Sequence, residues 1–307
     1  MQLFSSLRRP KAVFRHTPLD DNHEAIRCAS RKALDDMFKE LKNSAVHKLD
    51  DDDVKCLGII PKSLDSHLTT TSFFKPFPIE RMKQTPLDMN DEEIRLIIQA
   101  HRTRSEKIGP KDIDGGDLVY STLCTQFSTF LRVDQDGNQV DSLAGQSEWH
   151  GYHIDDDVLL EKYEAFGALG KSKLVPWTTD IRSVDRRHDG NPHILLMMIQ
   201  HTSPVEELLR TEILTLVGVI ITRLGAQSLA DHRVMPVMAL SCFQNARARI
   251  LQAFMTEAGL IIYKTKLYDF TDQENRDDAI EKCLSYMAST PIGDTKSLNY
   301  RLLPQDG

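Results

Sequence analysis

The sequence has few cysteines and no long apolar run. None of the five cysteines pairs with another in the C-x-x-C spacing of zinc ribbons and thioredoxin-type sites. They are Cys28, Cys56, Cys124, Cys242 and Cys283. We therefore expect reduced thiols in an intracellular protein. No apolar run reaches the ~18 residues that a spanning helix needs, so we expect no membrane span.

Excess charge and recognisable motifs are also scarce. With 38 Lys+Arg against 45 Asp+Glu, the formal net charge of the 307 residues is −7, which argues against a dedicated nucleic-acid-binding protein. The patterns G-x-G-x-x-G, G-x-x-x-x-G-K-[ST], G-x-S-x-G and H-E-x-x-H are all absent. These absences exclude the enzyme classes that are easiest to recognise from sequence.

Residues 1–19 predict a flexible basic tail. The tail lacks the apolar core of a signal peptide, which argues against secretion, and the first acidic residue is Asp20. Its basic residues are Arg8, Arg9, Lys11 and Arg15. We favour a plain tail on a cytoplasmic protein, and a mitochondrial presequence is the alternative.

Residues 20–110 predict a helical region. Apolar residues at three- and four-residue spacing predict one helix over 20–45 and a second over about 91–104. The buried stripe of the second helix is expected to contain Ile94, Ile97, Ile98 and His101. Between the helices, the acidic run 50–53 predicts a solvated linker.

A proline-rich segment over 61–86 interrupts this helical region. Its prolines are incompatible with a continuous helix, so we expect an extended arm. The arm carries Phe73, Phe74 and Phe77, which we expect to dock onto the body and to provide the contact for a protein partner. Deleting the arm is then expected to leave the body folded and to abolish association.

Residues 111–307 predict an α+β body that forms one compact unit with the helices. Its mixed or antiparallel sheet is expected to contain strands near 118–133, 193–200, 234–243, 249–256 and 260–268. The loop 134–138 and the residues 257–259 have the composition of turns.

A long helix over 204–224 is expected to pack against this sheet. Ser203, Pro204 and Glu206 form a helix-start signal, and the helix is apolar almost all round between Ile213 and Ile221, so it should be buried. Shorter helices are expected over 155–166 and 276–288. The inward residues of the last are Ala279, Ile280, Cys283, Leu284 and Met287.

A cluster of His150, His153 and Asp155 is the first candidate site. Imidazole and carboxylate groups are ligands of borderline divalent metals, so the cluster suggests a metal site. The simpler interpretation is that the acidic run 155–157 caps a helix and interacts with its dipole.

Three further residues invite comparison with nucleases of the PD-(D/E)XK type. In those enzymes a helix supplies a Glu and the following strands supply an Asp and an acid-x-Lys motif, so that the acids hold a metal ion and the Lys orients water. Here Glu212 lies on the predicted helix, and Lys264 and Lys266 lie on the last strand. The acid two residues before each lysine is missing, as is an Asp in strand 249–256. We therefore expect at most a degenerate relative.

The blocks 234–241, 249–253 and 266–270 carry a resemblance that covers about residues 192–293. This region resembles a recurrent segment of uncharacterised proteins from filamentous fungi. The resemblance implies a fungal origin, and it implies no activity, cofactor or catalytic residue.

We favour a non-enzymatic intracellular interaction or scaffold protein that binds a protein partner or a second copy of itself. A metal-assisted hydrolase is one alternative, and it alone would need a divalent metal. The other alternative is an accessory enzyme of fungal specialised metabolism that acts on an apolar small molecule. No cofactor is predicted.

Overall fold

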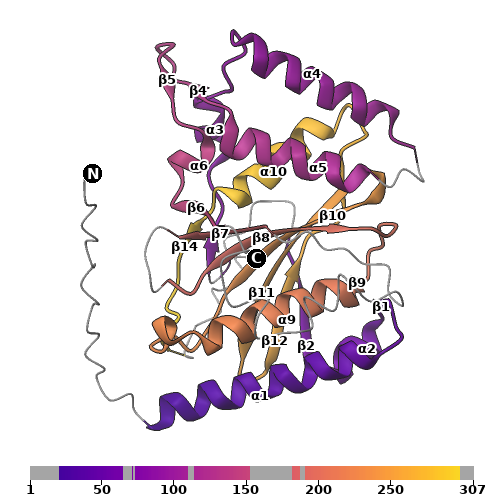
Figure 1. The fold of residues 1–307 in the computed structure, drawn as a ribbon, viewed down its shortest axis with the longest axis vertical. Helices are drawn as coiled ribbons and strands as arrows, with labels where there is room; N and C mark the ends of the chain where they lie inside the picture. Colours follow the sequence, from indigo (N-terminus) through magenta and orange to yellow (C-terminus); the bar gives the residue numbers. More distant parts are fainter. Residues whose placement is uncertain are drawn as a thin grey trace, which may run out of the picture.

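One large sheet separates two groups of helices (Figure 1). The computed structural model describes residues 21–64, 71, 73–109, 114–152, 182–186 and 191–297, and the statements below concern these residues. Helices and a mixed sheet together confirm the predicted α+β class. The predicted tail over 1–19 and the predicted helix over 155–166 lie outside the described residues.

The large sheet has the strand order β2-β12-β11-β10-β8-β7-β6, and β13 also pairs with β11. The pairs β8–β10 and β2–β12 are parallel and the others are antiparallel, so the sheet is mixed. The strands are β2 (Ile59–Ser63), β6 (Trp149–Tyr152), β7 (Arg182–Arg186), β8 (Ile194–Gln200), β10 (Val237–Phe243), β11 (Arg247–Thr256), β12 (Gly259–Lys264) and β13 (Tyr268–Asp269).

Four of the predicted strands are confirmed. β8, β10, β11 and β12 fall within or close to the expected ranges, and β10–β12 form an antiparallel meander. The expected tight turn joins β11 to β12 at Gly259, whose φ of +136° suits glycine. A Cβ at this position would lie 2.2 Å from the carbonyl oxygen of Gly58, so the chain also approaches β2 closely here.

The prediction of a strand over 118–133 is wrong. Helix α5 (Gly115–Cys124) and the π-helix η1 (Thr125–Thr129) occupy most of it, and the short hairpin of β4 (Arg132–Val133) and β5 (Gln139–Val140) follows. Buried α5 side chains recur at helical spacing: Leu118, Val119, Thr122 and Leu123. The predicted turn within 134–138 is confirmed, because the Asp134 carboxylate accepts hydrogen bonds from the backbone of Asp136 and Asn138.

Two glycines explain why α5 begins where it does. The start of α5 lies against the backbone of η4 (Gln244–Ala246), and a Cβ on Gly115 would lie 2.2 Å from the backbone nitrogen of Ala246. Gly115 and Gly116 therefore mark a close approach of two backbones and not the entry to a strand.

Helix α9 (Arg210–Gly225) covers one face of the sheet, with α1 (Asp21–Asn43) packed outside it (Figure 1). Residues from Ile213 to Ile221 are all buried, as predicted, because α9 lies between the sheet and α1. The acidic run does not form a linker. Asp50 caps the short helix α2 (Asp51–Cys56) by accepting from the backbone N–H groups of Asp52 and Asp53.

The predicted start of α9 at residue 204 is wrong. The helix begins at Arg210, and the Glu212 carboxylate accepts from the backbone N–H of Leu209 at 2.9 Å. Just before it, β9 (Leu208–Leu209) pairs with β1 (Lys48–Leu49). The guanidinium of Arg249 also donates hydrogen bonds to the carbonyl oxygens of residues 205, 206 and 207. These carbonyl groups are therefore not available for the hydrogen bonds of a helix that begins at Ser203 and Pro204.

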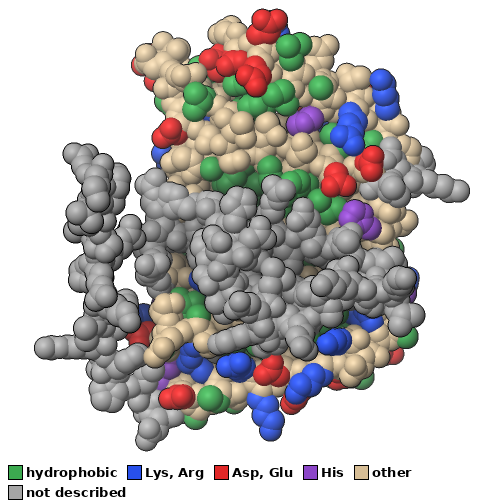
Figure 2. Space-filling model, viewed as in Figure 1, with side chains coloured by type: hydrophobic (Ala, Val, Ile, Leu, Met, Phe, Trp, Pro, Cys, Tyr) green, Lys and Arg blue, Asp and Glu red, His purple; other side chains and the backbone are tan. Residues whose placement is uncertain are grey.

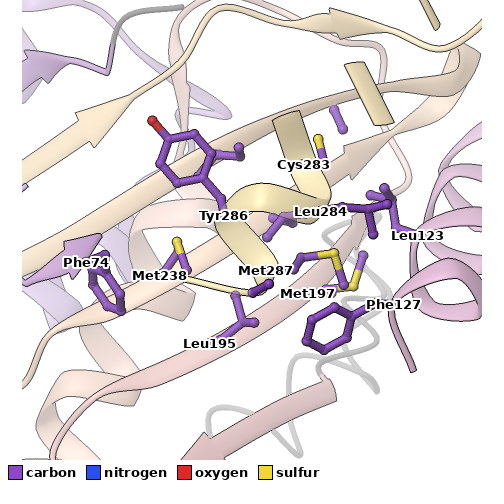
Figure 3. Packing of buried hydrophobic residues seen from close by; sticks show 14 of the residues in the cluster. Phe74, Leu123, Phe127, Leu195, Met197, Met238, Cys283, Leu284, Tyr286 and Met287 are labelled. Carbon is purple, nitrogen blue, oxygen red and sulfur yellow. The ribbon is translucent and has the colours of Figure 1, made fainter. Parts of the chain in front are cut away.

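The opposite face of the sheet is covered by α5 and α10 (Arg276–Met287). Helix α3 (Ile79–Gln84) contacts α10, and α4 (Glu92–Lys107) contacts α5. Figure 3 shows Met197, Met287 and Phe127 gathered in the core between the sheet and α10. The predicted inward residues of α10 are all buried.

The described part of the segment 61–86 contributes side chains to the core, and the prediction of an extended arm is wrong over α3 (Ile79–Gln84), which is a helix. Phe73, Phe74 and Phe77 are 0%, 1% and 6% exposed, and the ring centroids of Phe73 and Phe254 lie 4.7 Å apart. The predicted docking of these rings onto the body is confirmed, but the expectation that they are exposed to a partner is wrong. Deleting the segment would remove core side chains, so the body would not stay intact.

Several short elements complete the described fold. β3 (Phe74–Lys75) pairs with β14 (Thr290–Pro291), and α6 (Leu143–Gln146) and the 3-10 helix η3 (Gln227–Leu229) lie in connections. Asp91 caps α4 by accepting from the backbone N–H groups of Glu93 and Ile94. None of the described helices combines the length and the apolar character that crossing a bilayer requires.

Candidate functional site

Two of the three residues predicted as catalytic lie in one polar cluster on the α9 side of the sheet. Glu212 contacts Arg249, and the ammonium of Lys264 donates to the carbonyl oxygen of Glu206. Burial, and then the positive charge of Arg249, lower the pKa of Lys264. Lys266 follows β12 and is exposed, so it does not join this cluster.

Arg249 organises the cluster, which we call the Arg249 cluster. The side chains of Arg249 and Glu212 are both 0% exposed, and Arg249 Nε donates to Glu212 Oε1 at 2.8 Å while Nη2 bonds Oε2. Nη1 donates to the carbonyl oxygens of Val205 and Glu206 at 3.0 and 3.1 Å, and Nη2 donates to that of Glu207 at 2.9 Å. Every nitrogen of this buried guanidinium therefore has a partner.

The carboxylate of Glu212 is equally well satisfied. Oε2 accepts from the backbone of Leu209 as well as from Arg249, and Oε1 accepts from Arg249. A divalent cation would have to displace a guanidinium whose own positive charge repels it. The geometry therefore suits a structural ion pair that fixes the chain before α9, and not a metal-binding carboxylate.

The predicted His150, His153 and Asp155 cluster falls largely outside the described residues. The backbone of His150 lies on β6, paired with Asp185 on β7, and the positions of His153 and Asp155 are not among those described. Within the described ranges, no three His, Cys, Asp or Glu side chains are grouped so that they could hold a metal ion. The metal site stays a prediction.

A cavity of about 330 Å³ lies on the opposite side of the sheet, between α3, α4, α5 and α10. We call it the α4–α10 cavity. Figure 2 shows hydrophobic side chains gathered on the face of the molecule over these helices. The apolar part of the cavity wall includes Leu87, Ile98, Leu118, Phe270 and Leu284. Its volume is at the lower end of the range, roughly 300–1,000 Å³, that is typical of small-molecule sites.

Two buried arginines also line the cavity. Arg132 and Arg276 are 3% and 7% exposed. Arg132 Nη1 donates to the carbonyl oxygen of Thr85 at 2.7 Å, but its Nε has no hydrogen-bond partner among the described residues. In Arg276, both Nε and Nη1 lack such a partner within the same residues, and Nη1 lies 3.7 Å from Glu106 Oε1. Burial lowers the pKa of Arg132 to about 10, so the group stays charged at neutral pH.

His101 is a further polar residue of the cavity wall. Burial, and then the positive charge of Arg104, lower the pKa of His101 and favour the neutral ring at pH 7. Nε2 lies 3.4 Å from Ser121 Oγ, whereas Nδ1 is buried and unpaired within the described part of the chain. A hydrolytic triad needs a group that orients the histidine through this second nitrogen. The ring therefore lacks the surroundings of a general base in such a triad.

The apolar stripe of α4 is a signal for this cavity that is visible in the sequence, because it places His101 on the inner face of the helix. Ile94 and Ile98 on that stripe are buried. Arg132 and Arg276 carried no signal, since isolated arginines in a sequence are typical of an exposed surface. Their burial arises from contacts between segments that are far apart along the chain.

Comparisons of the chain with protein-family models, with curated proteins and with solved structures find no match. The proposal below therefore depends on the geometry of the molecule itself.

Proposed function

We propose that this protein is a non-enzymatic binding protein, and that the α4–α10 cavity is its binding site for a small apolar molecule. The single observation that carries this proposal is a cavity of about 330 Å³ whose accessible surface is mainly apolar. Apolar concavities with a few polar groups are the usual sites of small ligands.

The state of the predicted catalytic residues supports binding over hydrolysis. Both oxygens of Glu212 are engaged by Arg249, so this carboxylate has no free position for a metal ion. Lys264 donates to a backbone carbonyl oxygen and not toward a substrate space. A metal-assisted hydrolase that would use Glu212 and Lys264 is thus less well supported than a binding protein.

A protein partner or a second copy of the chain is the second candidate, and the outer side of α4 favours it. Leu96 on α4 is 54% exposed, and Met89, which precedes α4 and lines the cavity, is 47% exposed, so both apolar side chains are accessible to a partner. Replacing Leu96 with Glu should abolish an oligomer formed through this surface, as measured by light scattering after gel filtration. An unchanged molar mass would argue against this surface.

We also propose a cytoplasmic location in a fungal cell, with no nucleic-acid partner. All five cysteines are free, which suits a reducing compartment, and the net charge of −7 disfavours phosphate backbones. A mitochondrial location is the alternative, and imaging of the tagged full-length chain would separate the two.

The binding proposal is tested with N-phenyl-1-naphthylamine, an uncharged dye that fluoresces in apolar sites. We expect saturable binding to the wild-type chain and its loss in a Leu118→Trp variant, because Leu118 lines the cavity and the larger ring would fill it. The matched control is Leu96→Trp, which adds the same ring at an exposed position of α4. Equal binding by all three proteins would overturn the proposal.

A further inference from the structure

The α4–α10 cavity contains buried hydrogen-bond donors that nothing in the described protein satisfies. They are Nε of Arg132 and both Nε and Nη1 of Arg276. A buried N–H without a partner is costly, and the cost is larger when the group is charged. A complementary acceptor in the cavity would remove this cost.

The acidic groups around the cavity do not supply that acceptor. Asp277 and Glu281 also line it, but Asp277 pairs with Arg102 at 3.1 Å and Glu281 pairs with Lys83 at 3.2 Å. Both ion pairs are partly exposed, and within each pair the negative and positive charges cancel. Glu106, which is 42% exposed, approaches only Nη1 of Arg276, at 3.7 Å and without a hydrogen bond.

The remaining charge inside the cavity is therefore positive, and the wall around it is apolar. We propose that the ligand is an apolar carboxylic acid whose carboxylate accepts hydrogen bonds from Arg276 while its hydrocarbon part contacts Leu118 and Phe270. This inference rests on the proposed binding function and adds the chemical class of the ligand. Carboxylates are natural partners of arginine, and such charge-assisted hydrogen bonds are stronger than neutral ones.

The cavity favours a compact monoanion over a phosphorylated ligand. Arg276 lacks hydrogen-bonded partners at two nitrogens and can therefore pair with one carboxylate, whereas the additional oxygens of a phosphate would need further donors. The volume of about 330 Å³ suits a small acid with a short alkyl chain or a single ring system.

The test is displacement of N-phenyl-1-naphthylamine from the full-length chain at pH 7.5 by octanoate and by 1-octanol, which have the same chain length. We expect octanoate to compete more strongly than the alcohol. An Arg276→Met variant should keep the dye but lose this preference, by about ten- to a hundredfold, which is the factor expected when a charge-assisted hydrogen bond is removed. The control Arg104→Met removes a positive charge from the exposed side of α4 and should leave the preference unchanged.

The outcomes separate this inference from the proposed function. Dye binding with no preference for octanoate, or a preference that survives Arg276→Met, would overturn the carboxylate inference and leave the binding function standing. Absence of both dye binding and direct octanoate binding, measured by calorimetry, would overturn both. Arg276→Lys keeps the charge and should retain part of the preference, which excludes loss of folding as the cause of the effect.

Discussion

Arg249 and Arg276 are both buried arginines, but they lie on opposite sides of the sheet and differ in their hydrogen-bond partners. On the α9 side, Arg249 has a carboxylate and three carbonyl oxygens around it and no free N–H nitrogen. On the α10 side, Arg276 lines a cavity, and two of its nitrogens have no partner among the described residues.

This difference distinguishes an arginine that stabilises the fold from an arginine that can bind a ligand. A buried ion is tolerated when its hydrogen bonds are complete, and an incomplete set is a sign that something else completes it. Residue type and burial alone would have assigned the same role to both arginines, so the useful signal is the set of partners around each.

The largest expected effect is on Arg249. Replacing it with Met leaves Glu212 charged and buried without its partner, so we expect a loss of about 3–5 kcal/mol in the free energy of unfolding, measured by urea denaturation. The control is Arg247→Met, whose partly exposed pair with Asp269 should cost at most about 1 kcal/mol. Equal losses in the two variants would show that the buried pair has no special role.

The same substitution at Arg276 tests whether this arginine also stabilises the fold. Arg276→Met removes unsatisfied donors, so the free energy of unfolding without ligand should change by no more than about 1 kcal/mol, in either direction. Urea denaturation beside the Arg249→Met variant provides the measurement. A loss as large as that of Arg249→Met would mean that Arg276 is also a structural charge.

His101 gives a smaller effect that depends on pH. Its pKa in the folded protein lies below the ordinary 6.5, so above pH 6.5 both states carry the neutral ring and this group adds no pH dependence. As the pH falls below 6.5, the unfolded chain binds the proton more readily, and the free energy of unfolding decreases. A His101→Phe variant should lose this part of the decrease in urea denaturation between pH 7.5 and 5. An identical pH profile would contradict the assignment.

The smallest expected effect is an absence of reaction at two thiols. Burial raises the pKa of Cys242 and of Cys283, both of which lie in the core between the sheet and α10. In native protein, iodoacetamide should modify the exposed Cys28 and Cys56 first, as followed by mass spectrometry of peptides. Rapid modification of Cys283 would show that the α10 side opens to solvent, and would weaken the contrast between the two sides.

Regular patterns in the sequence predicted the long elements well. α1, α4 and α10 have clear helical periodicity, and β8 and β10–β12 are apolar runs bounded by turn residues, so local sequence was sufficient. The failures occurred where distant contacts decide the local structure. Arg249 controls the start of α9, and the approach of η4 to Gly115 places a helix where a strand was expected.

The candidate site was predictable only in part for the same reason. Glu212 and Lys264 were correctly placed on neighbouring elements, but the sequence did not show that Arg249 would occupy the carboxylate. The α4–α10 cavity is formed by residues of four helices, of η1 and β4, and of connecting segments, and its two buried arginines look like ordinary surface residues in the sequence.

The parallel pairing of β2 with β12 has a consequence for how the chain is made. Ile59 pairs with Leu260 and Ser63 with Lys264, so β2 has no partner strand on the ribosome until residue 264 has been synthesised. Pairing across such a long separation is slow, and an unpaired strand edge can join other chains. The newly made N-terminal region therefore exposes an unpaired strand until the last third of the chain emerges, and truncated products are expected to aggregate.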